Sequence, residues 1–409
     1  MSSMMVGIDV SLRSHHVQFM DEEGISLGSF AISNNRLGAD TLIRRIKDCA
    51  KKKASTEIRI GLEATSNLGW HLAHYLRSAF ADNHLSLQVY MINARKLARF
   101  KKGYDTLPKN DQIDSWVIAD HIRFGRLPHE MKDVIQYDAL RRLTRTRFHI
   151  MQRIVQEKNF FLNQVFLKFP SLRQDNPFST PFGATSLAVI QELEPEQIAA
   201  MPIEELANFL RDKGKNRFHN TEEIAAYLKK IARSTFRLDK AMADPVNLSL
   251  SSTLSILKHM EREVEKLDKE ITKIVKTIPE TLSSVKGIGP VFTAGIIAEI
   301  GDISKFKNHN ALAKYAGFVW NQTQSGEFEA DETRRMKTGN KYLRYYLTQA
   351  ANCVRKHDSE YKAYYMKKYN EVPKHKHKRA LVLTARKLVR LVFTLLKTKQ
   401  LYIPPERRG

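Results

Sequence analysis

The order of the apolar runs in the N-terminal part of the chain limits the possible folds more than any other feature. MMVGIDV is short, apolar and rich in β-branched residues, and HHVQFMDEEGISLGSFAI contains two more such runs joined by the turn-forming DEEG. Helical spacing follows in RLGADTLIRRIKDCAKK, and EIRIGLE and LSLQVYMIN predict two more strands on either side of the helical SNLGWHLAHYLRSAF. With a final helix, the order βββαβαβα predicts an α/β domain with a mixed sheet, the ribonuclease-H-like arrangement.

Four acidic residues occupy positions that this sheet would bring together. Asp9 lies in the first strand (GIDVS) and Glu63 ends the fourth (IGLEATS), which the topology places beside the first. Asp111 and Asp114 are three residues apart in KNDQIDSW, on one side of a helical turn. The alternative is a charged first turn with Asn110 as N-cap and acids favoured by the helix dipole.

Convergence of four carboxylates has a chemical consequence. They can converge only if a cation neutralises them. Hard oxygen ligands suit Mg²⁺, with Mn²⁺ as a second choice. Two such ions stabilise the attacking and leaving oxygens in phosphoryl transfer.

The charge of the chain favours a polyanionic partner. Its 67 Lys and Arg against 44 Asp and Glu give a net charge of +23. The basic residues are spread over several segments, as expected for several surfaces facing nucleic acid: 44–53, 95–102, 141–158, 334–344 and 362–399. A ribosome-like or merely very soluble surface would explain the charge, but not the carboxylates.

Other composition features point to a globular protein of the cytoplasm. Apolar residues make up 42% of the 409 residues, and the mean hydropathy is −0.41. The apolar stretch near the C-terminus is interrupted by Arg386, Lys387 and Arg390, so no membrane span is expected. The N-terminus has no signal-peptide pattern. Two distant cysteines, Cys49 and Cys353, are too few for a disulfide framework or a zinc cluster, which favours a reducing compartment.

Two long helices are predicted in the middle of the chain, over 137–169 and about 250–278. Apolar residues of the second step alternately by three and four, as in a coiled-coil seam, although an ordinary bundle helix fits as well. The two helices could form a hairpin that spaces the end domains or joins protomers. The seam residues are Leu257, Met260, Val264, Leu267, Ile271, Ile274 and Ile278. Between them, 170–245 reads as a helical insertion without recognisable chemistry.

The C-terminal part contains patterns typical of nucleic-acid binding. LSSVKGIGPVFTAGIIAEIGD, residues 282–302, predicts a helix-hairpin-helix whose glycines let the backbone approach a phosphate. RRMKTGNKYLRYYL then interleaves cations with tyrosines. Alternatively, the tyrosines are core residues and the cations a solvated helix face. The candidate nucleic-acid contacts are Lys286, Gly287, Gly289, Arg334, Arg335, Lys337, Asn340, Lys341 and Arg344.

Ser325 lies in the polar segment NQTQSGEF, which is expected to be a loop. A serine before glycine is usually part of a turn. A nucleophile needs an activating base, and no adjacent histidine is visible. A metal ion or a pocket of arginines could replace that base.

Three segments together resemble a known family. GIDVS, GLEATSNLGWHL and KNDQIDSWVIADHIRFGRLP resemble the DEDD, RuvC-like domain of the IS-one-ten family of insertion-sequence transposases. VKGIGPVFTAGIIAEIGDISKFKNHNALAKYAGFVWNQTQSGEF and KTGNKYLRYYLTQAA look like the family's C-terminal transposase domain. The resemblance covers about 5–170 and 250–355, in the family's order.

The resemblance implies roles for individual residues. By it, Asp9, Glu63, Asp111 and Asp114 bind the catalytic metal, and Ser325 is the nucleophile toward DNA. It implies enzymes guided by a structured non-coding RNA, the bridge RNA, which pairs with target and donor DNA, and dimers that assemble into tetramers. The chain departs from the pattern in GFVWNQ, where many relatives have a proline, and in a longer 170–245 segment.

The combined expectation is an RNA-guided DNA transposase or recombinase acting on nucleoid DNA in a prokaryotic cytoplasm. Its expected domains are a RuvC-like DEDD domain over 1–130, a helical or coiled-coil region over 131–280, and a C-terminal transposase domain with a basic tail over 281–409. Two alternatives stay open: a metal-only, RuvC-like, structure-specific DNA endonuclease, and a non-catalytic nucleic-acid-binding scaffold.

Overall fold

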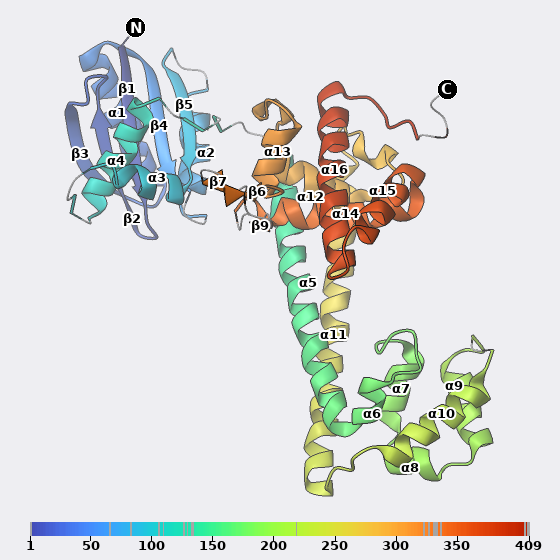
Figure 1. The fold of residues 1–409 in the computed structure, drawn as a ribbon. Coiled ribbons are helices and arrows are strands. Elements are labelled where there is room, and N and C mark those ends of the chain that lie inside the picture. Colours follow the sequence, from blue (N-terminus) through green and yellow to red (C-terminus); the bar gives the residue numbers. More distant parts are fainter. Residues whose placement is uncertain are drawn as a thin grey trace. The chain divides into compact units, whose positions relative to one another are not determined.

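The chain forms two compact units, Met1–Val134 and Ile135–Gly409 (Figure 1). The computed structural model describes residues 2–64, 67–81, 84–104, 107–108, 110–125, 127–128, 130–131, 135–217, 219–321, 324–325, 328–329, 334–335, 338–404 and 406. For 321, 324–325, 328–329 and 334–335 it describes the backbone only. In this described part, no helix is both long and apolar enough to cross a membrane. The three-domain division stays a prediction.

The N-terminal unit is built on a mixed five-stranded sheet with the strand order β3-β2-β1-β4-β5. β1 is antiparallel to β2 and parallel to β4, and β4 is parallel to β5. The predicted neighbourhood of the first and fourth strands is therefore confirmed. The strands are β1 Ser2–Val10, β2 Ser14–Met20, β3 Ser26–Ser33, β4 Ser55–Glu63 and β5 Ser86–Ile92.

Helices cover both faces of this sheet. On one face, β1 residues Met4, Val6 and Ile8 share a core with α1 (Arg36–Lys53) and α2 (Trp70–Ala79). On the other face, Met5 packs with residues of α4 (Asp111–Arg123). This alternation follows from the two-residue period of a strand. The structure adds a short helix, α3 (Ala94–Lys101), in a segment for which only basic residues had been noted.

Two long helices dominate the C-terminal unit. α5 (Ile135–Lys168) and α11 (Lys240–Val275) lie side by side (Figure 1). Leu257 and Val264 of the predicted seam pack with Ile154 of α5. The apolar seam therefore faces a helix of the same chain, and contact between protomers through these helices stays a prediction.

The described residues of the predicted insertion form five helices, which share one core with the ends of the two long helices. Phe161 and Val165 of α5, together with Leu250 and Leu254 of α11, contribute to that core. It therefore lies against the end of the long pair where α5 finishes and α11 begins. The helices are α6 Pro170–Gln174, α7 Ala184–Glu192, α8 Pro195–Ala200, α9 Ile203–Lys213 and α10 Thr221–Ser234.

The other end of the long helices joins a separate core. Leu140 of α5 and Ile271 of α11 pack there with residues of α12, α14 and α16. Gly295 permits close packing, because a Cβ at this position would lie 2.3 Å from the Tyr346 ring. The helices are η1 Leu282–Ser284, α12 Pro290–Ile300, η2 Ile303–Lys305, α13 His309–Ala316, α14 Lys341–His357, α15 Ser359–Asn370 and α16 Lys376–Thr398. Between α13 and α14 the described residues include the short strands β6 Trp320–Asn321, β7 Gln324–Ser325, β8 Phe328–Glu329 and β9 Arg334–Arg335.

Candidate active site

Asp9 and Glu63 lie at the carboxyl ends of two neighbouring parallel strands. Each directly follows a residue of the last pair between β1 and β4, which is Ile8 with Leu62. Those two residues point into the core beneath α1 and α2. Because successive side chains alternate, Asp9 and Glu63 belong to the opposite face, on which α4 packs.

Two glycines allow α4 to lie directly on these strands. A Cβ at Gly7 would lie 2.1 Å from the backbone oxygen of Ser115, and one at Gly61 would lie 2.6 Å from the Ile122 side chain. Both glycines are two residues before an acid, on the same face as that acid. Only a residue without a side chain permits this approach, so the glycines determine how near the helix comes to Asp9 and Glu63.

The first turn of α4 supplies the other two acids. Asn110 is its N-cap, and the Asn110 side chain accepts a hydrogen bond of 2.8 Å from the backbone amide of Ile113. Asp111 is exposed and Asp114 half-buried. The charged first turn considered as an alternative is therefore present. It does not compete with a role for the acids, because the same turn faces the ends of β1 and β4.

The pKa of Asp9 depends on the other three carboxylates. The pKa of Asp9 is raised from 3.8 to about 6, first by burial and then by the negative charges of Glu63, Asp114 and Asp111 in that order, against a smaller lowering by a backbone hydrogen bond at Val10. A carboxyl among like charges resists ionisation unless a cation joins the group. The cluster therefore has an excess of negative charge on its own.

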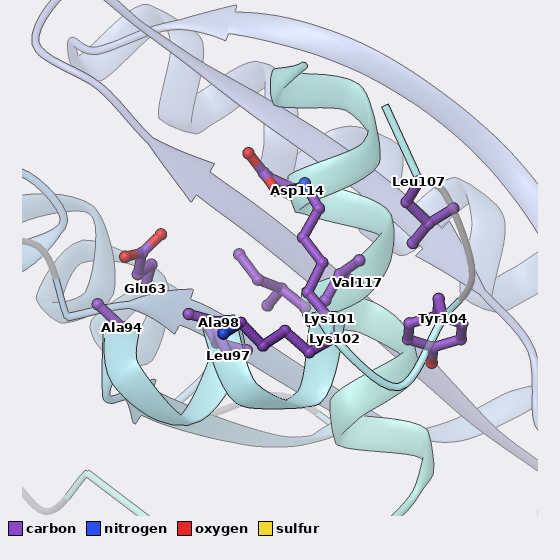
Figure 2. Close-up of a pocket in the computed structure, with 11 residues that line it drawn as sticks. Glu63, Ala94, Leu97, Ala98, Lys101, Lys102, Tyr104, Leu107, Asp114 and Val117 are labelled. Carbon is purple, nitrogen blue, oxygen red and sulfur yellow. Dashed lines mark hydrogen bonds and ion pairs between the residues drawn. The ribbon is translucent and has the colours of Figure 1, made fainter. Parts of the chain in front are cut away.

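Among the residues that the structure describes, two cationic or ionisable side chains contact the acids of α4. Lys101 extends from α3 to Asp114, with 2.6 Å between Nζ and Oδ1 (Figure 2). His16, which pairs with Asp9 across β1 and β2, places its Nε2 atom 3.7 Å from Asp111 Oδ2. Sequence reasoning missed both. Lys101 is one of several basic residues in a row, and the sequence does not indicate which of them pairs with Asp114.

A cavity of about 460 Å³ lies beside the acids, between α3 and α4. Glu63 and Asp114 line it together with Lys101 and Lys102 (Figure 2). The site thus offers carboxylate oxygens next to ammonium groups. That combination can hold a divalent cation together with a phosphate.

The donor set fits a divalent cation in kind. Hard carboxylate oxygens are the ligands that Mg²⁺ and Mn²⁺ prefer. Among the residues that the structure describes, however, no three His, Cys, Asp or Glu side chains are gathered in a metal-binding arrangement. In this conformation Asp114 is turned to Lys101 and Asp111 to His16.

The structure places the remaining candidates in the C-terminal unit. Ser325 lies in the two-residue strand β7, paired with Phe328 of β8, and not in an unpaired loop; its side chain is outside the described part. Arg334 and Arg335 form β9, whose side chains are also outside it, as is Lys337 altogether.

The predicted helix-hairpin-helix glycines lie just before α12. Lys286 and Gly289 are exposed. Gly287 has a φ of +104°, and a Cβ there would lie 2.9 Å from backbone atoms of Val354 in α14. This glycine is therefore required by contact with a neighbouring helix. Phosphate binding at Gly287 and Gly289 stays a prediction.

Two of the candidate nucleic-acid contacts make structural hydrogen bonds. Asn340 caps α14, and its amide nitrogen donates to Glu299 Oε2 at 2.7 Å. Arg344 donates to the backbone oxygens of Ala316 and Thr338. Lys341 lies over the Tyr342 ring, with Nζ 5.0 Å from its centre.

A cluster of α5 and α14 side chains was not predicted. Phe148 contacts Tyr342 and Tyr345 edge to face, and the Arg145 guanidinium lies 4.6 Å from the centre of the Tyr342 ring. Arg145 also binds Glu299 through two hydrogen bonds of 2.7 and 2.8 Å. The tyrosines gave a signal in the sequence, but their partners on α5 are far away along the chain.

Comparison with protein families gives two matches. A family model described as a transposase, of the DEDD type of IS110 elements, matches residues 6–170. A second, described as transposase of the IS116/IS110/IS902 family, matches residues 279–366. The chain carries both domains of the IS110-family transposases. The resemblance inferred from the sequence is confirmed.

Two relatives of this IS110-family chain match it over most of its length. A protein of Streptomyces clavuligerus, "Insertion element IS116 uncharacterized 44.8 kDa protein", is 24% identical over 98% of this chain and 96% of its own length. A second, of Streptomyces coelicolor, is named "Mini-circle putative transposase for IS117" and is 25% identical over 77% of this chain and 76% of its own length. Together with the family models, these relatives support an enzyme of DNA transposition, with DNA as its substrate.

Proposed function

We propose that this IS110-family chain is an RNA-guided DNA transposase that cleaves and rejoins DNA strands with a carboxylate-bound metal and a serine nucleophile. In this proposal the N-terminal unit is a RuvC-like, ribonuclease-H-like domain. Asp9, Glu63, Asp111 and Asp114 hold Mg²⁺, which Mn²⁺ can replace. Residues 282–302 act as a helix-hairpin-helix on the nucleic-acid backbone.

The observation that carries the metal site is the arrangement of the acids: Asp9 and Glu63 follow neighbouring parallel strands, and the turn with Asp111 and Asp114 starts the helix that packs on the same face. The raised pKa of Asp9 agrees with it. Partial burial near three other carboxylates disfavours ionisation, and a protein keeps such a group charged most easily by binding a cation. The nearby ammonium group of Lys101 forms its ion pair with Asp114 and does not directly neutralise the charge of Asp9. The opening of the cavity beside Glu63 and Asp114 gives a phosphate room to approach.

A bound Mg²⁺ stabilises negative charge on the phosphate oxygens during phosphoryl transfer. The residues of the chain have separate tasks. Asp9 and Glu63, on rigid strands, fix the position of the ion, and α4 brings Asp111 and Asp114 to it. Lys101 and Lys102, on the wall of the cavity, bind and orient the DNA phosphate.

Ser325 is proposed as the nucleophile on the basis of the family resemblance. Its hydroxyl oxygen forms a bond to phosphorus while the bond from phosphorus to one DNA oxygen breaks. The serine proton is lost and the departing oxygen gains one. A phosphoserine ester links protein and DNA until a DNA hydroxyl reverses the step, which rejoins the strands.

The first experiment separates the two parts of the site. Wild-type protein, Asp9→Asn, Ser325→Ala and the control Ser283→Ala are titrated with Mn²⁺ and then incubated with labelled substrate DNA and guide RNA. We expect Asp9→Asn to weaken Mn²⁺ binding at least tenfold, and Ser325→Ala to bind Mn²⁺ normally without forming a covalent DNA adduct. Unchanged Mn²⁺ affinity in Asp9→Asn would rule out the metal site, and an adduct in Ser325→Ala would rule out the nucleophile.

The guide is proposed to be a structured RNA, with the protein as a dimer that forms a tetramer in the synaptic complex. The net charge of +23 is consistent with binding two kinds of nucleic acid. The test reconstitutes the purified protein with RNA transcribed from the non-coding segments that flank the open reading frame. DNA cleavage that needs this RNA and follows changes in its loops supports guidance, whereas equal cleavage without it contradicts guidance.

A metal-only endonuclease is the second candidate. It is favoured by the location of all four acids within the N-terminal unit, which suffices for hydrolysis by activated water. This enzyme would cut branched DNA equally well with Ser325→Ala. A non-catalytic scaffold, the remaining alternative, would keep its function in Asp111→Ala.

A further inference from the structure

A second cavity of the N-terminal unit, of about 520 Å³, lies on the other face of the sheet. It is formed by β2, the start of α1 and α2. His15 lines it and pairs with Val10, which belongs to the core beneath α1 and α2. The acid cluster lies on the opposite face, so this cavity has no part in the site described above.

His15 is the residue of this cavity whose buried side chain has, within the described part of the chain, no hydrogen-bond partner at one ring nitrogen. Its side chain is only 1% exposed. The backbone amide of Ser11 donates to its Nδ1 atom at 3.3 Å. Burial lowers the pKa of His15, although the nearby Asn34 side chain acts in the opposite direction. The neutral ring must then carry its hydrogen on Nε2.

That Nε2–H group is buried and has no hydrogen-bond partner among the described residues. A buried donor without an acceptor costs about 1–3 kcal/mol. The Asn34 side chain lies near the ring and favours its protonated form. Its amide nitrogen donates to the backbone oxygens of Ser11 and Leu12, and its amide oxygen, the only acceptor it has, makes no hydrogen bond with Nε2. An acceptor supplied by a ligand would remove the cost.

The remainder of the cavity is suited to a flat ring with an anionic group attached. Leu72 and Ala39 are buried and give an apolar floor. The Tyr75 ring forms a wall and is held by a 2.6 Å hydrogen bond from its hydroxyl to Asp40. At the mouth, exposed Arg36 lies with its guanidinium carbon 5.9 Å from the centre of that ring.

We propose that this cavity binds a single unpaired nucleotide, with the base inside and the phosphate at the mouth. The base stacks on Tyr75, a base oxygen or ring nitrogen accepts from His15 Nε2, and Arg36 binds the phosphate. The volume is within the range of about 300–1,000 Å³ that is usual for small-ligand pockets. A bare anion would gain nothing from the apolar floor, and an apolar ligand would leave His15 without an acceptor.

The proposal depends on the chain acting on nucleic acid, and on neither the metal site nor Ser325. RNA and DNA both supply such a nucleotide. The consequence is an anchor for one unpaired residue of a strand, placed on the face of the sheet opposite to the acids.

Saturation-transfer NMR on the full chain, in EDTA, tests it with the four ribonucleoside and four deoxyribonucleoside 5′-monophosphates. We expect base protons of at least one nucleotide to receive saturation, with ribose 5-phosphate and inorganic phosphate competing at least tenfold less well. Preference for the ribose or the deoxyribose series identifies RNA or DNA as the source. Competition by inorganic phosphate as strong as by nucleotides would overturn the proposal.

Variants locate the binding. His15→Phe keeps a ring but removes the donor, and should weaken nucleotide binding at least tenfold; Arg36→Gln should weaken it about threefold to fivefold. The matched controls His84→Phe and Arg44→Gln, both at exposed positions, should bind as the wild type does. Equal binding by His15→Phe, if it retains the wild-type circular dichroism, contradicts the assignment.

A cross-linking measurement keeps the proposal testable if His15→Phe does not fold. Trinucleotides containing 4-thiouridine or 4-thiothymidine are irradiated with the wild-type chain, and the modified peptide is mapped. The expected adducts are on the α2 segment that contains His71 and Tyr75, and Arg36→Gln should reduce them. Adducts that are confined to other segments would show that the nucleotide binds elsewhere.

Discussion

At the residue scale, the charged form of Asp9 lowers the stability of the folded chain, and the same carboxylate is a proposed metal ligand. Its carboxyl is partly buried near Glu63, Asp114 and Asp111, which raises its pKa to about 6. The unfolded chain has the ordinary value of 3.8. Between these two values the folded chain binds more protons than the unfolded chain, so the folded state loses stability as the pH rises through this window.

Asp9→Asn should therefore stabilise the metal-free protein, but only where Asp9 is charged. We expect its melting temperature in EDTA to exceed that of the wild type by about 3–5 °C at pH 8. The difference should nearly vanish at pH 4, where the carboxyl is protonated in the folded chain. Calorimetry at both pH values checks this. Asp48→Asn, on the exposed side of α1, is the control and should show no such pH-dependent gain.

In the proposed metal site, Lys101 would compete with the metal ion for Asp114. Because its ammonium group lies 2.6 Å from the carboxylate, Lys101→Ala should raise the Mn²⁺ affinity of the DNA-free protein about threefold to tenfold. Isothermal titration measures the change. Lys102→Ala removes the same charge from the same cavity without breaking a described ion pair, so a gain of equal size there would show only a general charge effect.

Much of the acid cluster could be predicted at this scale, because strand alternation and the i, i+3 spacing on a helix are local rules. Asp9, Glu63, Asp111 and Asp114 were chosen from such rules, and the pKa of Asp9 responds to the other three. The pairings of Lys101 and His16 could not be predicted, since they depend on side-chain directions from elements that are remote along the chain.

At the scale of elements, the contact of α4 with β1 determines whether the acids can act together. The helix lies so close to the strand that the backbone of Ser115 and Ala119 would touch any side chain at position 7. Rigid backbone atoms cannot move aside as the end of a flexible side chain can. The contact between α4 and β1 therefore determines where Asp111 and Asp114 lie relative to Asp9.

Gly7→Ala should push α4 away from β1. The new Cβ would lie 2.1 Å from the Ser115 oxygen, and overpacking of this kind costs about 1–3 kcal/mol or more. We expect a lower midpoint of urea unfolding and weaker Mn²⁺ binding, although no acid is altered. Gly289→Ala, where the new atom meets open space, should change neither.

A buried ion pair connects three helices of the C-terminal unit. Glu299 of α12 is 1% exposed in its side chain, Arg145 of α5 is 40% exposed, and Asn340 at the start of α14 donates to the same carboxylate. Removal of the arginine leaves a buried carboxylate short of its partner, whereas removal of the acid leaves a cation that water can reach. The two substitutions should therefore lower the free energy of unfolding by different amounts.

Arg145→Met should destabilise the C-terminal unit by about 3–5 kcal/mol, and Glu299→Gln by clearly less. Urea unfolding of the two variants and of the double variant measures the difference. The double variant should recover part of the loss, because no buried charge is left without a partner. Equal losses in both single variants would contradict this account.

Helix and strand periodicity predicted most of these elements, including the five strands in order and both long helices. α3 was missed because eight residues rich in Arg and Lys give little apolar periodicity. Ser325 was placed in a loop because two-residue strands such as β7 leave no period to detect. Contacts between residues far apart in the sequence, such as Arg145 with Glu299, leave no pattern in the neighbouring sequence from which they could be predicted.

At the scale of the whole molecule, the acids and the serine segment belong to different units. All four acids, together with Lys101 and His16, lie within Met1–Val134, and this unit has cores of its own. Ser325 lies within Ile135–Gly409. Metal binding and covalent chemistry should therefore be separable by cutting the chain.

A fragment of residues 1–134 should fold and bind Mn²⁺ with a dissociation constant within about twofold of that of the full chain. Circular dichroism and isothermal titration check the two parts of this statement. The complementary fragment, 135–409, serves as the control and should not bind Mn²⁺ in the same range. Loss of binding by the N-terminal fragment would show that the other unit completes the site.

The long helices also set a spacing that can be compared with DNA. Leu140 of α5 belongs to the C-terminal core and Phe161 to the core of the insertion. Phe161 is 21 positions after Leu140, which corresponds to about 32 Å along the helix at ~1.5 Å per residue. One turn of B-DNA measures about 34 Å, so a duplex lying along this helix pair would present the same groove to both cores.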